Sequence, residues 1–225
     1  MKRPYGLYCR VFFYIFYMTK EQQKFYDIKQ TTDYIEIGDD LDYKVYADHE
    51  NKEVVLLFEE TDSDRDWQNN FSILPWPLKL DSKTIWTTHG YARIYSSGCN
   101  KPMDDFTCTV MQYPNYKTVI RGFSLGSAMA KIAARHFIIR FPESHIDELT
   151  TYGDVKCWFN PFYSLKKDVL RLREYAYIND GITWCVPFYR RDKKCKVGPR
   201  FSICKLFKTA YNHEHYEEYD YTKWE

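Results

Sequence analysis

Thr118 to Ala130 reads TVIRGFSLGSAMA, a β-branched run followed by a glycine-bounded serine and then by small residues. The pattern predicts a buried strand over Lys117–Arg121 and a helix over Ser124–Arg140. In a Gly-x-Ser-x-Gly turn of this kind, a sharp strand-to-helix reversal lifts a serine hydroxyl above the edge of a sheet. Gly122 and Gly126 remove Cβ atoms that would clash at the reversal. Ser124 is therefore a candidate nucleophile, and the alternative is an ordinary serine in a turn of the same shape.

Strands and helices alternate along the rest of the chain, which predicts a mainly parallel sheet with helices on both faces. The run EVVLLF at Glu53–Phe58 is apolar throughout, as in a strand covered on both faces. Ile73–Leu78 contains two prolines, so it is predicted to be neither a helix nor a central strand. The other predicted helices are Thr19–Gln30 and 102–111, and the other predicted strands are Tyr43–Ala47, Glu148–Tyr152 and Glu174–Ile178.

The 225 residues suit one domain, which we place at residues 18–225. Residues 1–17 are predicted to be an N-terminal apolar appendage. Lys2 and Arg3 before its apolar part are typical of a secretion signal, but Arg10 interrupts the run and no small-residue cleavage site follows. A cytoplasmic location is favoured, and secretion is the alternative if residues 1–17 act as a signal. The net charge of +1 gives no overall field that would attract nucleic acid.

The seven cysteines include no CxxC pair and no Cys/His spacing that suits zinc, so no metal is predicted. No cofactor is predicted, because the chain has no glycine-rich phosphate loop or dinucleotide fingerprint. Reduced thiols in a cytosolic protein are the favoured interpretation. Three disulfides with one thiol left over are the alternative, and Cys195–Cys204 is then the first pair to test.

Five further segments accompany the serine turn, in a fixed order along the chain. They are FEET at 58–61 with Ser63, Asp66-Trp67 and Asn70 after it, HGY at 89–91, TYG at 151–153, Asn179-Asp180 with Val186-Pro187, and His213 near the end. Together with GFSLG they resemble the class 3 lipase family, and the size is closer to the shorter phage and bacterial members than to the fungal enzymes. The resemblance implies an α/β-hydrolase fold with a central, mostly parallel sheet. One departure is Glu59-Glu60, where the family has Arg-Gly.

The resemblance also assigns roles to residues. Ser124, Asp180 and His213 would form a Ser-Asp-His triad, with His215 as the alternative base and Asp154 as the alternative acid. The oxyanion would be held by the amide of Leu125 and by Thr61.

The activity so implied is hydrolysis of lipid carboxylic esters, as in a triacylglycerol lipase or a phospholipase of the A type, through an acyl-enzyme on Ser124. Lipid esters would be the substrates, with transient contact at a membrane or lipid-droplet interface. Two alternatives stay open: a peptidase or thioesterase built on the same turn, and a catalytically inactive scaffold that acts as a binding protein. The segment Ile73–Leu78 would be either a flap over the acyl pocket or a rigid loop packed on the core.

Overall fold

The computed structural model describes residues 19–31, 34–37, 41–59, 72–98, 100–159, 164–177, 179–180, 183, 194–197, 215–216, 219 and 221. The predicted appendage at residues 1–17 lies outside these residues, as do Thr61, Ser63, Asp66-Trp67, Asn70 and His213.

The core of the molecule is a seven-stranded sheet in the order β1-β2-β3-β6-β7-β8-β9. From β3 to β9 every neighbouring pair of these strands is parallel, and the two pairs at one edge, β1–β2 and β2–β3, are antiparallel. This confirms the predicted mainly parallel sheet. The strands are β1 (Ile35–Ile37), β2 (Leu41–Asp48), β3 (Glu53–Phe58), β6 (Lys117–Phe123), β7 (Ile146–Tyr152), β8 (Val169–Tyr177) and β9 (Lys194–Val197).

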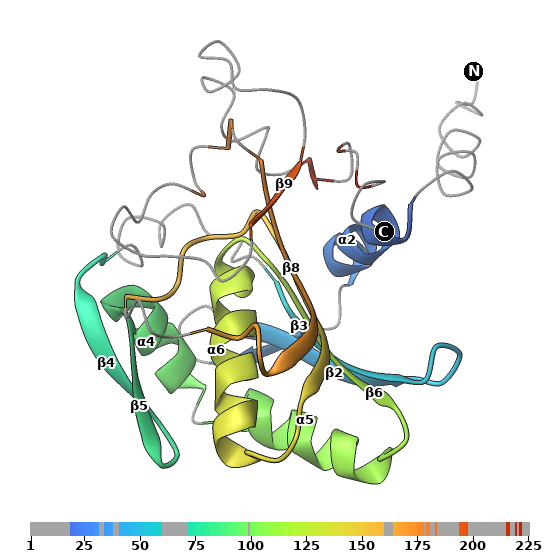
Figure 1. The fold of residues 1–225 in the computed structure, drawn as a ribbon, viewed down its shortest axis with the longest axis horizontal. Coiled ribbons are helices and arrows are strands. Elements are labelled where there is room, and N and C mark those ends of the chain that lie inside the picture. The colour runs from blue at the N-terminus through green and yellow to red at the C-terminus, as the bar shows by residue number, and fades with distance from the viewer. Residues whose placement is uncertain are drawn as a thin grey trace, which may run out of the picture.

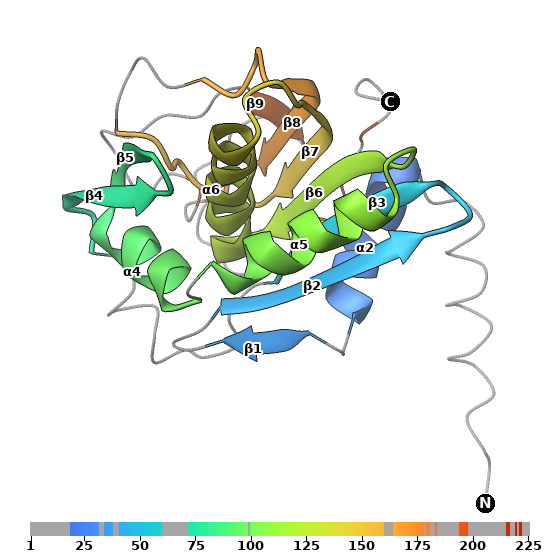
Figure 2. The same cartoon turned by 90° about the horizontal axis from the view of Figure 1, so that it is seen from below.

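Helices cover both faces of the sheet (Figure 1). One face packs on α4 (His89–Ser97), α5 (Lys101–Gln112) and α6 (Leu125–Arg140), and the other on α2 (Lys20–Gln30). The view in Figure 2 shows α5 and α6 lying over the sheet. α6 is central, and its alanines and Gly126 are buried because the helix touches both β6 and β3.

Aromatic side chains fill the face that α2 covers. Phe25 and Ile28 of α2 pack there with Val55, Val119 and Phe123. The C-terminal segment closes the rest of this face with three buried tyrosines, Tyr216, Tyr219 and Tyr221. The high aromatic content of the chain therefore serves in part to bind its own C-terminal segment to the sheet.

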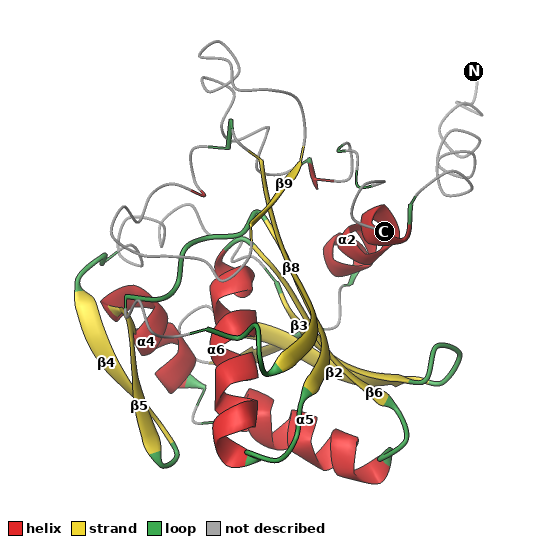
Figure 3. Ribbon diagram, viewed as in Figure 1, coloured by secondary structure: helices red, strands yellow, loops and turns green. Residues whose placement is uncertain are grey.

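A separate hairpin lies beside α4 (Figure 3). It consists of β4 (Pro75–Leu80) and β5 (Lys83–Thr88), which pair with each other and with no described strand of the central sheet. The prolines of the segment Ile73–Leu78 thus sit in a two-stranded hairpin outside the central sheet. The buried side of the hairpin, formed by Leu78, Leu80 and Ile85, packs into the main core.

Candidate active site

Ser124 stands between the end of β6 and the start of α6 in a strained backbone conformation. Its φ of 54° and ψ of −119° place a non-glycine residue in a region that L side chains seldom adopt. Its amide donates a hydrogen bond to the carbonyl of Tyr152 at the end of β7 (3.0 Å), and its carbonyl accepts one from the amide of Ser127 (2.9 Å). The turn is therefore fixed from both sides, and the serine is 1% exposed.

The two glycines of the turn are required by close backbone approach. A Cβ on Gly122 would lie 2.2 Å from the carbonyl oxygen of Gly126. A Cβ on Gly126 would lie 2.5 Å from the carbonyl oxygen of Phe58. Real Cβ atoms do not approach backbone oxygens so closely, so only glycine lets the first turn of α6 rest against the end of β3.

Three candidate residues follow the carboxyl ends of three adjacent parallel strands. Ser124 follows β6, Asp154 follows β7, and Asp180 follows β8. Because neighbouring parallel strands end at the same edge of a sheet, these residues share one edge of the molecule. That edge is where ligands bind in open α/β sheets.

Asp180 is fully buried and bonded to the C-terminal segment. Its Oδ2 accepts a hydrogen bond from the hydroxyl of Tyr216 (3.0 Å), and that hydroxyl accepts one from the amide of Tyr177 (2.8 Å). Burial and the Asp180 charge raise the pKa of Tyr216 well above its usual range, so the phenol stays a neutral donor. His215, which directly precedes Tyr216 in the chain, is half-buried.

Asp154, the alternative acid, is bound differently. Its Oδ1 accepts hydrogen bonds from the ammonium group of Lys131 (2.8 Å) and from the hydroxyl of Thr151 (2.9 Å). Lys131 and Asp154 are both fully buried, and Glu174 lies 3.5 Å from the same ammonium group. Burial alone would favour the neutral amine, but the charges of Asp154 and Glu174 raise the pKa of Lys131. The carboxylate of Asp154 is thus committed to an ion pair.

Three of the six histidines, His49, His136 and His145, lie away from this arrangement. His49 and His145 stand at the opposite edge, in the turn before β3 and just before β7. His136 lies in α6, roughly 18 Å along the helix from Ser124, where its Nδ1 is 3.1 Å from the hydroxyl of Tyr95. A fourth, His89, begins α4 directly after β5, and its ring centroid lies 4.7 Å from that of Trp76.

Leu125 is the first residue of α6, and an amide in the first turn of a helix has no carbonyl partner within the helix. It is therefore suited to donate to an oxyanion beside Ser124. Two of the predicted site residues, Thr61 and His213, lie outside the described part of the chain.

Cys108, Cys157 and Cys195 carry thiols in this structure. Cys204, the other member of the alternative Cys195–Cys204 pair, lies outside the described residues. Within the described residues, no group of three or more His, Cys, Asp or Glu side chains is arranged to hold a metal ion. Within the same residues, no helix is long and apolar enough to cross a membrane.

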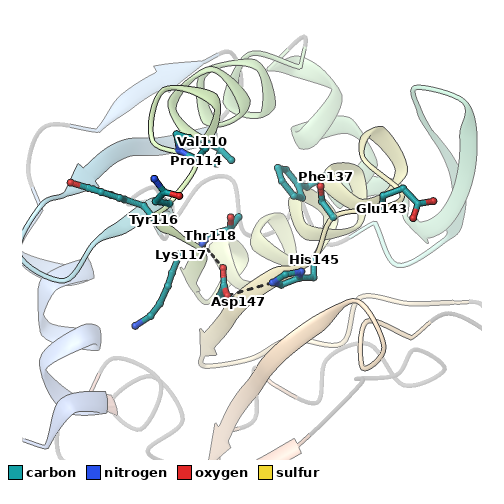
Figure 4. Close-up of a pocket in the computed structure, with 11 residues that line it drawn as sticks. Val110, Pro114, Tyr116, Lys117, Thr118, Phe137, Glu143, His145 and Asp147 are labelled. Atoms are coloured by element: carbon teal, nitrogen blue, oxygen red, sulfur yellow. Dashed lines mark hydrogen bonds and ion pairs between the residues drawn. The ribbon is translucent and has the colours of Figure 1, made fainter.

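A cavity of about 460 Å³ lies at the other end of the sheet (Figure 4). It is lined by Lys117 and Thr118 at the start of β6 and by His145 and Asp147 near the start of β7. Asp147 accepts a hydrogen bond from the amide of Thr118 (2.8 Å) and lies 3.6 Å from His145. Because Ser124 follows the carboxyl end of β6, this cavity is not part of the candidate active site.

The sheet order, the helices on both faces and the strained serine turn after a central parallel strand define an α/β-hydrolase. The profile of the family "Lipase (class 3)" matches residues 55–181, which is more than half of the 225 residues. This chain belongs to the class 3 lipase family. The matched region includes both Ser124 and Asp180.

Solved fungal lipases share the fold. A Rhizomucor miehei lipase in a propeptide complex is 19% identical, with 73% of this chain and 56% of that chain covered and a TM-score of 0.60. Lipase II from Rhizopus niveus is 20% identical, with 66% and 57% covered and a TM-score of 0.57. A triacylglycerol lipase whose catalytic centre is formed by a serine protease triad is 20% identical, with 73% and 65% covered and a TM-score of 0.60. This chain spans less than two thirds of the length of each.

Sequence reasoning did not find Tyr216 or Lys131. Tyr216 is one of 21 tyrosines, and nothing in its local sequence marks it as a partner of Asp180. Lys131 does carry a signal, because it is a charged residue in the otherwise apolar run from Ala128 to Ala134 of a buried helix. A lysine at such a position needs buried acids as partners.

Proposed function

We propose that this protein is a serine hydrolase that cleaves carboxylic esters of lipids through an acyl-enzyme on Ser124. The observation that carries the proposal is the backbone of Ser124, a non-glycine residue held at φ 54° between a central strand and a buried helix. A strained backbone persists only where the surrounding structure maintains it, and such residues are concentrated at functional sites. Membership of the class 3 lipase family supplies the substrate class.

In the proposed mechanism, the hydroxyl of Ser124 attacks the ester carbonyl while His213 removes its proton. His213 then protonates the departing alcohol, and a water molecule, deprotonated by the same imidazole, hydrolyses the acyl-enzyme. Asp180 holds the imidazole in the correct tautomer and stabilises its protonated form. His215 is the alternative base.

The bond from Tyr216 to Asp180 supports this choice of acid and base. It brings the C-terminal segment to the carboxylate that follows β8. His213 stands three positions before Tyr216, a separation that an extended chain spans in at most about 11 Å. Asp154 is less suited to the role because Lys131 already neutralises it.

The negative charge that develops on the substrate oxygen needs donors that are already in place. We assign these to the amide of Leu125 and to Thr61. Each such donor contributes about 3 kcal/mol to lowering the barrier. The acyl esters of triacylglycerols and of phospholipids fit the proposal equally. Activity assays on esters that differ in acyl-chain length and head group would identify the preferred substrate.

The test is hydrolysis of p-nitrophenyl butyrate, a soluble ester. We expect steady release of p-nitrophenol by the natural protein and a loss of at least about a thousandfold in Ser124→Ala. Ser144→Ala, at an exposed serine before β7, is the matched control and should keep full activity. An inactive binding scaffold would show no turnover in any of the three proteins.

The choice between the two histidines needs separate variants. We expect His213→Ala to lose activity as fully as Ser124→Ala does, and His215→Ala to retain most of it. The reverse result would assign the base to His215 and leave the class of reaction unchanged.

A further inference from the structure

Residues 126–134 of α6 are buried and, apart from two side chains, apolar. The two polar ones are Ser127 and Lys131, and both are fully buried. They are four positions apart, so they lie on the same face of the helix. Burying an ammonium group is costly unless acceptors bind it. These two side chains therefore need partners outside the helix.

Both side chains bind the segment that directly follows β7, residues 154–157, which we call the β7 loop. The hydroxyl of Ser127 accepts a hydrogen bond from the amide of Val155 (3.1 Å), and the ammonium group of Lys131 donates to the carbonyl of the same residue (2.5 Å). The ammonium group also donates to Asp154 (2.8 Å). Helical side chains point toward the helix N-terminus, so Lys131 reaches back toward the end of α6 that carries Ser124. One turn of α6 thus binds both backbone groups of Val155.

The β7 loop lies between the serine turn and the strand that leads to Asp180, because β7 lies between β6 and β8 in the sheet. On one side, the amide of Ser124 donates to the carbonyl of Tyr152, the last residue of β7 (3.0 Å). On the other side, the amide of Asp154 donates to the carbonyl of Tyr175 in β8 (3.0 Å). A displacement of the β7 loop would therefore change the separation between the nucleophile and the candidate acid.

Stability alone does not account for charged groups at this place. Lys131, Asp154 and Glu174 are all fully buried, and Glu174 lies 3.5 Å from the ammonium group. Apolar side chains of similar volume often stabilise a core as well as a buried ion pair does, or better. Hydrogen bonds differ from apolar contacts because they hold the groups they join within a narrow range of distance and angle. The arrangement therefore suits a positioning role better than a purely stabilising one.

We infer that Ser127 and Lys131 are positioning residues for the reaction at Ser124. They hold the β7 loop, and through it they keep Ser124 at the distance from Asp180 at which one imidazole can bind both. Because they are fully buried, they act through other residues rather than on the ester. A displacement of about 1 Å at the reacting groups can lower the rate about a hundredfold. The inference rests on the proposed function, and it names two further residues on which the rate depends.

The kinetic test uses Lys131→Met/Asp154→Leu, because the single lysine variant would leave buried carboxylates without their cation. At a temperature at which circular dichroism shows the protein to be folded, we expect kcat for p-nitrophenyl butyrate to fall about a hundredfold, with KM changed by less than about twofold. Ser127→Ala removes one hydrogen bond and should lower kcat about fivefold. The matched control, Arg140→Met, removes a cation with two acidic partners from the other end of α6 and should keep the natural kcat.

Hydrogen exchange measures the positioning of the serine turn independently of hydrolysis. We expect the peptide that contains the amides of Ser124 and Ser127 to exchange at least about tenfold faster in Lys131→Met/Asp154→Leu than in the natural protein. Arg140→Met controls for a loss of stability alone, and this peptide should exchange at the natural rate there.

Unchanged exchange in the double variant would overturn the inference even if kcat falls, because Asp154 would then be acting as the catalytic acid. A natural kcat in the double variant would also overturn it. Absence of butyrate hydrolysis by the natural protein would instead refute the proposed function, and the exchange rates would still decide whether Ser127 and Lys131 hold the serine turn.

Discussion

At the scale of single residues, Tyr216 joins the candidate acid Asp180 to the C-terminal segment. Its hydroxyl accepts from the amide of Tyr177 and donates to Asp180, so it fixes the carboxylate and the C-terminal segment to the end of β8 at once. Since its pKa is raised well above the usual range, mainly by burial, it stays a donor at every pH at which the protein is assayed.

Tyr216→Phe removes this hydroxyl and keeps the ring that packs on Phe25. We expect kcat/KM for p-nitrophenyl butyrate to fall about tenfold, because Asp180 loses one hydrogen bond and is held less firmly. KM should change little, since no contact with the ester is lost. Tyr175→Phe is the control, because that hydroxyl bonds to Arg173 instead. Equal losses in both variants would mean that the effect is one of packing alone.

Gly126→Ala tests the close approach of α6 to β3. The added methyl group would meet the carbonyl of Phe58 at 2.5 Å, so the helix has to move away from the strand. We expect the free energy of unfolding to fall by about 3 kcal/mol or more, measured in urea. Gly98→Ala, at a helix end with φ −71°, should cost less than about 1 kcal/mol. A stable Gly126→Ala protein would contradict the geometry of the turn.

The serine turn was the part of the site that sequence predicted most fully, because local sterics determine it. The strand, the glycines, the serine and the helix are contiguous in the chain. The conformation of each part is therefore determined by residues close to it in sequence. Tyr216 could not be predicted in this way. Its contact with Asp180 spans 36 positions and depends on where Tyr216 lies against the end of β8.

At the scale of elements, the tip of the β4–β5 hairpin is attached to the end of α6. Asp81 lies in the turn, forms an ion pair with Arg140 at 2.9 Å, and has its Oδ2 3.2 Å from Nε2 of His136. The hydrogen bond from Arg140 is the main reason that the pKa of Asp81 is lowered to about 2. Burial lowers the pKa of His136, so that ring tends to be neutral at pH 7.

Asp81→Asn should therefore destabilise the protein in a pH-dependent way. Asparagine tolerates the positive φ of 44° at this position, so the turn is kept. We expect a loss of about 1 kcal/mol at pH 7. A lowered pKa means that the contribution of Asp81 is present above pH ~4 and is lost as the pH falls through about 2. Thermal unfolding of both proteins from pH 7 to pH 2.5 should show that the difference in stability between them decreases. A constant difference would contradict the ion pair of Asp81 with Arg140.

The elements β5, α4 and β9 were not predicted, because their local sequence patterns are weak. The strand β5 has only Ile85 and Trp86 as large apolar residues, and α4 includes Gly90 near its start. The packing of Tyr91 and Ile94 into the main core stabilises α4 where propensity does not. β9 was missed because a strand of four residues, Lys194–Val197, is defined by pairing with β8 rather than by its own pattern.

At the scale of the whole molecule, one buried cation joins three elements. Lys131 of α6 binds Asp154 after β7 and lies 3.5 Å from Glu174 in β8. The hydroxyl of Ser127, also in α6, accepts from the amide of Val155. These contacts fix the helix that follows Ser124 to the strand that leads to Asp180.

Lys131→Met leaves two carboxylates buried without their cation. We expect a loss of about 3–5 kcal/mol in the free energy of unfolding, because an uncompensated buried charge is costly. The double variant Lys131→Met/Asp154→Leu should recover part of that loss. Lys117→Met, at an exposed ion pair of 3.9 Å with Glu53, should change stability by less than about 1 kcal/mol. No difference between Lys131→Met and Lys117→Met would contradict the buried network.

The overall architecture was predictable because alternation of strands and helices restricts the sheet to few topologies. The sequence pattern does not specify which buried side chains of different elements meet. Lys131 and Glu174 are such a pair, and their contact depends on the order β6-β7-β8.

The central claim is that Ser124 is a reactive nucleophile, and intact-mass and peptide mass spectrometry after labelling with a fluorophosphonate tests it most directly. We predict one adduct per chain, located on Ser124 and absent from the Ser124→Ala variant. An unlabelled protein, or an adduct on a different serine, would contradict the claim.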